Sequence, residues 1–440
     1  MKRLFAILPL LLASTGINAQ EWIEIRPEAK PYTRWWWLGS AVDSANLSYN
    51  LQEYARAGIG GVEITPIYGV QGNDKNDIPY LSPKWMEALE YVVTKGRTEG
   101  IETNMSTGTG WPFGGPLVSI DDAAAKAIFQ QYDVEVDKKG QTLNVACSDP
   151  KQQKFARLDK VMAYKLSKDG NRTIIDLPPD TDKATGDVSL EKLGKGDWHI
   201  VALHIGRTRQ MVKRAAPGGE GYVIDHFSRG AVERYLHRFD TAFVNQYTEE
   251  YPHTFFNDSY EVYGADWTPL LLEEFAKRRG YHLEDFFPEF LLDNDRRTDA
   301  SRRIISDYRE TLGELLLENF TSQWTEWAHR QGSITRNQAH GSPANLIDIY
   351  AEVDIPECEG FGLSDFNIKG LRLDPGFTKK NDSDISMLKY ASSGAHISGK
   401  KFTSSETFTW LTEHFRTSLS QCKPDLDLLF ISGVNHVFFH

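Results

Sequence analysis

Several carboxylate side chains stand at the ends of short apolar runs in this sequence. Glu261 follows the run that ends at Asn257, and Glu406 precedes Thr407 at the end of another. Cleaving a glycosidic bond needs two carboxyl groups, one protonated as the acid and one ionised as a base or nucleophile. Glu261 and Glu406 are therefore our candidate catalytic pair. The plainer interpretation of any one such residue is a helix cap or an ion-pair partner.

Aromatic and polar side chains lie near these carboxylates. Phe, Trp and Tyr make up 12% of the chain, and a flat aromatic face can stack on the C–H surface of a sugar while polar groups bind its hydroxyls. The alternative for an aromatic residue is a place in the core, and for a histidine a hydrogen-bonded structural role. The candidate substrate-binding residues are Trp37, Trp111, Asp258, Asn337, His340, Trp410 and His436.

Glu357 and Glu359 lie two residues apart on an expected strand, so their side chains point to the same side. Two carboxylates facing the inside of a barrel fill it poorly, which indicates a cation site or an arginine partner. Carboxylate oxygens suit a hard cation such as calcium. The sequence has no H-E-x-x-H pattern, which argues against a catalytic zinc site.

The elements that must position these residues alternate between strand and helix. The first part of the chain predicts helices over 44–57 and 83–100, set between strands at 34–39, 62–68 and 101–106. Short alternating runs between 126 and 222 then predict an inserted β-rich domain.

The alternation resumes with a helix over 228–247 and further helices between 268 and 329. Helices are also expected at 386–396 and 414–421. The remaining strands are expected at 254–260, 334–339, 354–358, 401–407 and 427–430, the last continuing as 434–439.

Eight parallel strands with intervening helices fit an α/β fold, the (β/α)₈ barrel of the TIM type. A doubly wound open sheet is the alternative, disfavoured because no G-x-G-x-x-G follows a strand. The expected domains are a signal peptide at 1–19, barrel segments at 20–125 and 223–440, and the β-rich insert at 126–222. In such barrels the site lies at the C-terminal ends of the strands.

The first nineteen residues have the pattern of a signal peptide. Lys2 and Arg3 precede an apolar stretch from Leu4 to Leu12, which is too short to cross a bilayer, and Ala19 is the expected cleavage point. A retained membrane anchor is the alternative. We expect a periplasmic or secreted protein with no membrane attachment after cleavage.

Composition excludes several other classes of protein. A net charge of −12 disfavours nucleic acid as a partner. The mean hydropathy of −0.45 and the presence of one long apolar run exclude a multispanning membrane protein. Three cysteines exclude a disulfide scaffold, and we expect buried thiols.

Several strings of the sequence resemble the bacterial α-L-rhamnosidases of glycoside hydrolase family 106, over nearly the whole chain from about residue 35 to 440. They are R-W-W-W-L-G-S (34–40), L-Q-E-Y-A-R-A-G-I-G-G-V-E-I-T-P-I-Y-G (51–69), S-T-G-T-G-W-P-F-G-G-P (106–116), A-A-P-G-G-E-G (215–221), N-Q-A-H-G-S-P-A-N (337–345), D-I-P-E-C-E (354–359) and S-S-E-T-F-T-W (404–410).

The resemblance implies an inverting, calcium-dependent hydrolase that removes terminal α-L-rhamnose from glycans. By motif, Glu261 would be the acid and Glu406 the base, with the roles open to exchange. Glu357 and Glu359 would be the calcium-side residues. Another glycosidase on the same barrel, such as a β-galactosidase-like enzyme, and a non-catalytic sugar-binding protein are the alternatives.

The length departs from this family. Its members are much longer and carry further β-rich domains after the barrel, whereas this chain stops at His440, on or just past the eighth strand. We therefore expect a chain truncated after strand eight, with C-terminal domains missing.

Overall fold

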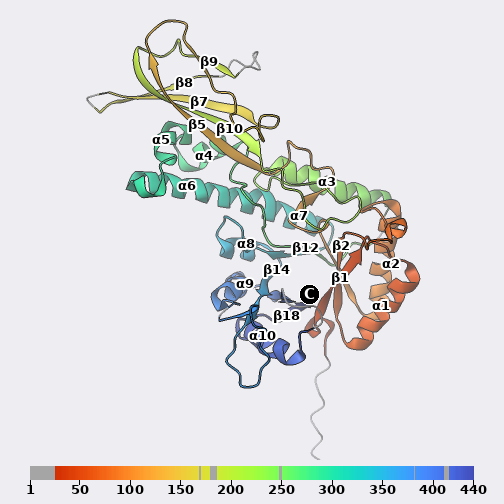
Figure 1. Cartoon of the computed structure of the whole chain (residues 1–440). Coiled ribbons are helices and arrows are strands. Elements are labelled where there is room, and N and C mark those ends of the chain that lie inside the picture. Colours follow the sequence, from red (N-terminus) through yellow and green to blue (C-terminus); the bar gives the residue numbers. More distant parts are fainter. Residues whose placement is uncertain (1–24, 168–169, 179–185, 247–249, 381, 411–415) are drawn as a thin grey trace, which may run out of the picture.

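Eight parallel strands close into a barrel at the centre of the molecule (Figure 1). The description comes from a computed structural model that covers residues 25–440 apart from 168–169, 179–185, 247–249, 381 and 411–415. The expected signal peptide at 1–19 and the start of the helix expected at 414–421 lie outside the described residues.

The barrel confirms the predicted fold class. Its strands follow one another around the barrel in the order β1-β2-β3-β12-β13-β14-β17-β18, and β18 pairs in parallel with β1 to close it. Their bounds are β1 Tyr32–Leu38, β2 Gly61–Ile67, β3 Glu102–Ser106, β12 Thr254–Asn257, β13 Ile334–Gln338, β14 Ile355–Phe361, β17 Ser404–Thr409 and β18 His436–Phe439.

Local signals in the sequence place the first two helices. Helix α1 (Ser44–Ala57) begins where the Asp43 carboxylate accepts the backbone N–H of Asn46, and it ends at Gly58 in the left-handed conformation, with φ of 85°. Helix α2 (Pro83–Glu99) follows the same plan, because the Ser82 hydroxyl caps its start. Both predicted helices are confirmed within one residue.

The remaining helices are α3 Arg229–Gln246, α4 Leu271–Arg279, α5 Phe287–Phe290, α6 Asp299–Leu316, α7 Gln323–Arg330, α8 Leu346–Glu352, α9 Ile385–Ile397 and α10 Leu419–Ile431. Most of them lie around the outside of the barrel, whereas α4 and α5 lie between α6 and the insert (Figure 1). A π-helical turn at Leu317–Ser322 joins α6 to α7, and short 3₁₀ turns lie at Pro27–Ala29, Asp74–Asn76, Leu283–Phe286 and Asn294–Arg296.

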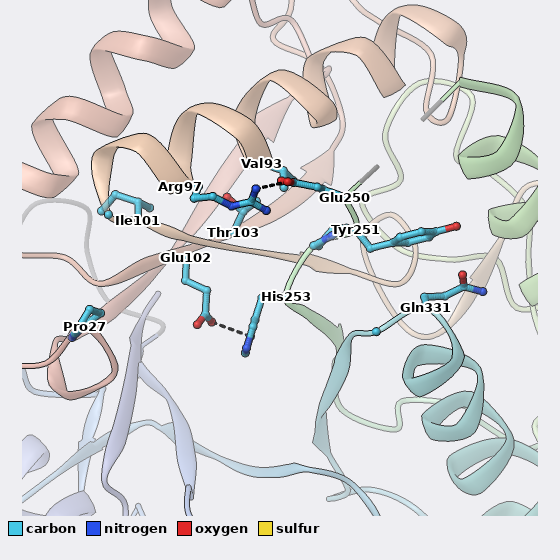
Figure 2. A pocket seen from close by; sticks show the side chains of 13 residues that line it. Pro27, Val93, Arg97, Ile101, Glu102, Thr103, Glu250, Tyr251, His253 and Gln331 are labelled. Atoms are coloured by element: carbon cyan, nitrogen blue, oxygen red, sulfur yellow. Dashed lines mark hydrogen bonds and ion pairs between the residues drawn. The ribbon is translucent and has the colours of Figure 1, made fainter. Parts of the chain in front are cut away.

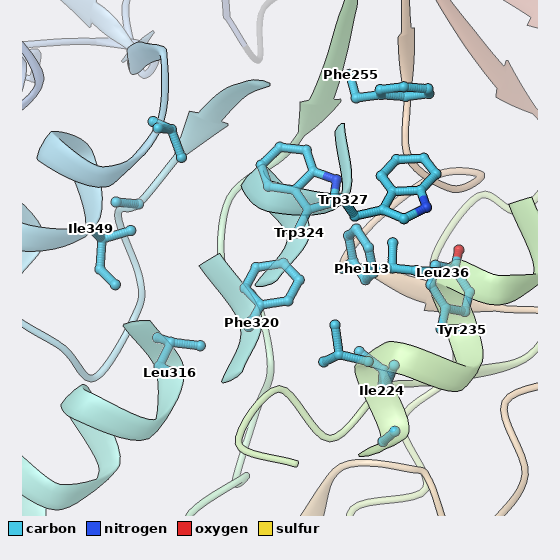
Figure 3. Packing of buried hydrophobic residues seen from close by; sticks show 14 of the residues in the cluster. Phe113, Ile224, Tyr235, Leu236, Phe255, Leu316, Phe320, Trp324, Trp327 and Ile349 are labelled. Atoms are coloured by element: carbon cyan, nitrogen blue, oxygen red, sulfur yellow. The ribbon is translucent and has the colours of Figure 1, made fainter. Parts of the chain in front are cut away.

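An aromatic cluster fixes the segment that leaves β3 (Figure 3). Phe113 packs edge-on against Phe320, with 4.9 Å between ring centroids, and Phe320 stacks on Trp324 at 6.2 Å. Burying such side chains stabilises the fold by about 1.5–3 kcal/mol each. The loop after β3, which carries Trp111, is therefore held in place because Phe113 packs into the core.

The insert is a β structure with its own small core. Its main sheet is antiparallel, in the order β5-β10-β7-β8, and projects away from the barrel (Figure 1). Val161, Leu190, Trp198 and Ile200 are among the residues buried in that core. The strands of this region are β4 Gly114–Gly115, β5 Ala125–Val136, β6 Thr142–Asn144, β7 Arg157–Leu166, β8 Arg172–Asp176, β9 Asp187–Ser189, β10 Gly196–Arg207 and β11 Tyr222–Val223. A further two-stranded sheet pairs β15 Leu363–Ser364 with β16 Thr378–Lys379.

The strand predicted at 427–430 is wrong, because these residues belong to helix α10. A short apolar run fits a buried strand and a helix equally well. The helix is chosen here by a capping box at its start, in which Ser418 and Gln421 bond each other's backbone N–H groups. The eighth strand is the predicted continuation, at His436–Phe439.

Two smaller expectations concern membranes and thiols. None of the helices in the described part of the chain combines the length and hydropathy needed to cross a bilayer. All three cysteines are free, with Cys147 and Cys358 buried and Cys422 partly exposed.

Candidate active site

Side chains of a barrel strand point alternately inward and outward, and the inward set here is charged. On β1, Arg34 faces inward and reaches carboxylates of other strands. The outward neighbours Trp35 and Trp37 pack edge-on against each other and against Tyr54 of α1 and Trp85 of α2. Branched apolar side chains usually fill such barrels, so a charged interior indicates a functional one.

The middle layer of the barrel is a buried ion network. Arg336 on β13 pairs with Glu63 on β2 and, at 2.7 Å, with Glu357 on β14; none of the three side chains is exposed. Burial lowers the pKa of Arg336 to about 10. Glu357 also accepts hydrogen bonds from Gln338 at 3.1 Å and Ser404 at 2.8 Å. Each buried charge therefore has a charged or polar partner.

Glu406 on β17 lies one layer higher, towards the C-terminal ends of the strands. Its Oε2 accepts from Arg34 at 2.7 Å and from Gln338 at 2.6 Å, and its Oε1 accepts from the Thr409 hydroxyl at 2.8 Å. Burial on its own would raise the pKa of Glu406, but the Arg34 charge and these hydrogen bonds lower it overall. The geometry thus favours an ionised carboxylate.

Asp258, just after β12, shares that arginine. Its Oδ2 lies 3.1 Å from Arg34 Nη2, the same nitrogen that contacts Glu406. Burial raises the pKa of Asp258 to about 7, although the Arg34 charge opposes this. Because both bonds end on one atom, the two carboxylate oxygens are less than about 6 Å apart, and the two carboxylates are close neighbours.

Glu359 and His340 form a pair at the same end of the barrel, with His340 Nε2 3.0 Å from Glu359 Oε2. Burial raises the pKa of Glu359, although the hydrogen bond from His340 opposes this. For His340, burial would lower the pKa, but Glu359 raises it overall. Asp258, Glu359 and Glu406 thus place three carboxylates around Arg34 and His340.

Glu261 lies further out, where the loop after β12 meets the returning end of the insert. Lys213 donates to its Oε2, the Tyr263 hydroxyl lies 3.0 Å from the same oxygen, and the Ser259 hydroxyl is 3.5 Å from its Oε1. The described contacts of Glu261 are therefore with the entrance rather than with Arg34. The two predicted catalytic glutamates occupy different depths of one opening.

Of two further predicted binding residues, Trp111 belongs to this opening, whereas Trp410 lies against Asp425 of helix α10. Trp111 lines a small cavity together with Asp258, Thr65 and Ser106. Trp410 follows β17 and lies partly buried, with its ring 5.2 Å from that of Phe408.

Three predicted binding residues are placed elsewhere, and these assignments are wrong. Trp37 faces outward and is 1% exposed, in the core beneath the helices. Asn337 also faces outward, where its Oδ1 accepts from Asn257 at 2.7 Å. His436 opens β18 at the N-terminal end of the barrel, 4.5 Å from the ring of Tyr32, and burial lowers its pKa to about 4.

The opening uses residues that sequence reasoning missed. Trp36 and His440 take the places expected for Trp37 and His436: their rings are 5.2 Å apart edge-on, and His440 Nε2 is 3.5 Å from Glu406 Oε1. The missed signal is the alternation itself. An arginine inside an apolar strand must face a buried carboxylate, so Arg34 points into the barrel. Residue 36, two positions further along the strand, then points inward as well.

Of the two residues predicted to bind calcium, Glu357 is not available to the ion. Glu357 has both carboxylate oxygens engaged, by Arg336 and Ser404 on one and Gln338 on the other. Glu359 alone of the two faces the opening, beside His340. Across the described ranges no three His, Cys, Asp or Glu side chains are grouped so as to hold a metal ion. We derive no step through calcium.

A larger cavity lies at the opposite end of the barrel (Figure 2). It has a volume of about 500 Å³ and is lined by residues at the starts of β3, β12 and β13, among them Glu102 and His253, which pair at 3.1 Å. Because ligands of such barrels bind at the C-terminal ends of the strands, this cavity is not part of the candidate site.

Comparison with known proteins gives a family match over the described chain. A family model described as glycoside hydrolase 106, α-L-rhamnosidase, matches residues 25–170 and 170–440. A curated protein of Formosa agariphila, named "Putative beta-glucuronidase", is 23% identical over 94% of this chain and 37% of its own length.

Solved structures show a likeness in fold. A rhamnosidase from Novosphingobium sp. PP1Y superposes with a TM-score of 0.71 at 17% identity, over 95% of this chain and 55% of that one. A β-galactosidase from Halorubrum lacusprofundi gives a TM-score of 0.49 at 9% identity, over 93% and 52%; a likeness this weak does not inform on substrate. The chain spans about half of these solved chains and about a third of the curated relative.

Proposed function

The chain belongs to glycoside hydrolase family 106, the α-L-rhamnosidases, and from that premise we propose that it hydrolyses terminal α-L-rhamnosyl bonds in glycans with inversion at the anomeric carbon. One observation carries the proposal. Glu406 lies at the C-terminal end of the barrel with its carboxylate kept ionised by Arg34, Gln338 and Thr409. An ionised carboxylate in that position is the base that an inverting glycosidase needs.

In this mechanism Glu406 removes a proton from water as the water attacks the anomeric carbon. Its Oε2 is held by two donors, so the proton goes to Oε1, which accepts one hydrogen bond from Thr409. General-base catalysis of this kind contributes about 10²–10⁴-fold to the rate. The water's oxygen becomes the new anomeric hydroxyl, on the face opposite the departing group.

We assign the acid role to Glu261, which protonates the oxygen of the leaving group as the glycosidic bond breaks. Asp258 has the raised pKa of an acid, but it shares one arginine nitrogen with Glu406, so we place it beside the base rather than across the sugar from it. Asp258 then binds a sugar hydroxyl, together with His340 at the same opening. Glu261, three residues further along, lies nearer the solvent.

Aryl glycosides test the function directly. The protein should hydrolyse an aryl α-L-rhamnoside, and NMR should detect β-L-rhamnose as the first product. Hydrolysis of an aryl β-D-galactoside or β-D-glucuronide in its place would assign another glycosidase activity on this barrel. Binding of rhamnose without hydrolysis of any aryl glycoside would support a non-catalytic sugar-binding protein.

We also propose that the protein is exported to the periplasm or beyond the cell, on the strength of the signal-peptide pattern at 1–19. N-terminal sequencing of the mature protein should find Gln20 as the first residue. A protein that retains Lys2 and Arg3 would contradict cleavage.

A further inference from the structure

The chain returning from the insert forms an outer rim around the opening, composed of Tyr68, Trp111, Lys213, Arg214 and Tyr263. Its backbone is held by hydrogen bonds: Lys213 N–H donates to Trp111 O at 2.7 Å, and Tyr68 N–H donates to Arg214 O at 3.2 Å. The approach is close, because a Cβ at Gly110 would lie 1.8 Å from the carbonyl oxygen of Lys213. The rim is therefore built into the fold.

The backbone at Arg214 is strained. This residue has a φ of +57°, a left-handed conformation that a long side chain rarely adopts. Such outliers persist where surrounding structure enforces them, and they concentrate at ligand-binding sites. The hydrogen bond from Tyr68 and the pairing of Trp111 with Lys213 supply that enforcement.

The guanidinium of Arg214 is exposed and lies between aromatic rings. It is 5.6 Å from the Trp111 ring centroid and 5.8 Å from that of Tyr68, whose hydroxyl it contacts at 3.1 Å. In the described part of the chain no carboxylate forms an ion pair with it. Lys213, its neighbour, is by contrast engaged by Glu261.

The rim lies next to Glu261, the residue to which we assign the acid role. Trp111 lines the small cavity beside Asp258, and Lys213 contacts Glu261, the proposed acid. The acid must stand next to the glycosidic oxygen, so the sugar beyond that oxygen meets the same residues. Tyr68 and Tyr263 are 45% and 63% exposed and offer further ring surface there.

We propose, resting on the function proposed above, that the outer rim binds the leaving-group sugar and selects one that carries a negative charge, as a carboxylate or a sulfate. Arg214 supplies the charge-assisted hydrogen bonds, because a guanidinium matches the oxygens of either anion. Trp111 and Tyr68 supply faces for the C–H surface of the sugar ring. The substrate is then a glycan in which rhamnose caps an acidic sugar.

Binding of single sugars tests this without turnover. Methyl β-D-glucuronoside, methyl β-D-glucoside 6-sulfate and methyl β-D-glucoside are titrated against the whole chain, with affinities measured by ligand-observed NMR. We expect one or both anionic sugars to bind about tenfold more tightly than the neutral one. The preference should weaken as salt is raised, since exposed charges are screened. The pattern between the two anions shows which one the rim recognises.

Two variants locate the preference. Arg214→Gln should abolish it. Arg209→Gln is the matched control, because Arg209 is exposed on the same returning segment, also has a positive φ, of +55°, and rests on Phe155 rather than on the rim. Equal affinity for all three sugars, or a preference that survives in Arg214→Gln, would overturn the proposal.

A kinetic comparison separates this proposal from the function on which it rests. Hydrolysis of the aryl α-L-rhamnoside tests the function alone, since that substrate carries no acidic sugar. The rim is tested by the kcat/KM ratio for rhamnose linked to the tighter-binding anionic sugar, the glucuronate or the glucose 6-sulfate, against rhamnosyl-glucose. This ratio should fall about tenfold in Arg214→Gln. A rhamnosidase with a ratio near one in the unmodified protein would keep the function and reject the anionic preference.

Discussion

Arg34 Nη2 lies 2.7 Å from Glu406 Oε2, although the two residues are 372 positions apart in the chain. They lie on β1 and β17, which are separated in the barrel by β18, so the contact crosses the barrel interior. The same nitrogen holds Asp258 at 3.1 Å. One arginine thereby sets both the charge of the proposed base and its distance from a second carboxylate.

The lowered pKa of Glu406 predicts activity that persists into acid. A base must be ionised, and a carboxyl whose pKa is lowered in the folded protein stays ionised until the pH falls below the usual glutamate range. Arg34→Lys loses the guanidinium nitrogen that contacts Glu406 Oε2 and should raise that pKa. The acidic limb of the kcat/KM profile should then move up by about one pH unit. Thr409→Val removes a neutral hydrogen-bond donor and should move the acidic limb of this profile less. If the acidic limb stayed in place in both variants, Glu406 would not be the base whose titration limits the rate.

Removal of the base should abolish turnover while preserving sugar binding. We expect Glu406→Gln to lower kcat by about 10²–10⁴-fold, with little change in the affinity for rhamnose measured by calorimetry. Glu233→Gln, an exposed position on α3, is the control and should leave kcat unchanged. A Glu406→Gln protein with ordinary kcat would refute the assignment.

Leaving-group dependence should distinguish Glu261 from Asp258 as the acid. A poor leaving group needs protonation and a good one does not, so Glu261→Gln should reduce kcat/KM far more for methyl α-L-rhamnoside than for a nitrophenyl rhamnoside. Asp258→Asn should reduce both alike, mainly through KM, because it loses a contact to the sugar. The opposite pattern would transfer the acid role to Asp258.

Calcium dependence follows from the family resemblance and is tested by chelation. If calcium assists, a chelator should lower kcat/KM and added calcium should restore it. Glu359→Gln should then raise the calcium concentration required, whereas Glu357→Gln should not, because both oxygens of Glu357 are engaged inside the barrel. A rate that is indifferent to the chelator would show that this protein does not depend on calcium.

The ion network in the barrel should contribute strongly to folding. Arg336→Met leaves Glu357 buried without its cation and Glu63 with Arg34 alone, which should lower the free energy of unfolding by about 3–5 kcal/mol. Urea denaturation measures this. Neutralising both carboxylates as well, with Glu63→Gln and Glu357→Gln, should recover part of the loss. Lys401→Gln removes an exposed ion pair with Glu28 and serves as the control, for which we expect no measurable change in the free energy of unfolding. If Arg336→Met and Lys401→Gln lowered this free energy equally, the network would not be what stabilises the barrel.

Much of the fold could be read from local patterns. The helices predicted at 44–57 and 83–100 were bounded correctly because helix caps act within one turn of the chain. Asp43 and Ser82 cap their starts, and Gly58 and Gly100 end them in the left-handed conformation. The run at 427–430 was misread because its choice between strand and helix depended on the capping box at Ser418, a few residues upstream.

The sequence by itself determined the fold class, the family and the acidic residues near the strand ends, because these depend on periodicity and on contiguous strings. Which side of a strand each residue faces depended on closure of the barrel. Closure turned Trp36 inward and Trp37 into the core, and placed His440, not His436, beside Glu406. The charge of Glu406 depended on its contact with Arg34. The position of Arg214 depended on how the chain that leaves the insert packs against Tyr68 and Trp111. Electrostatic interactions act through space over a few ångströms, so only the tertiary structure could decide which charges meet.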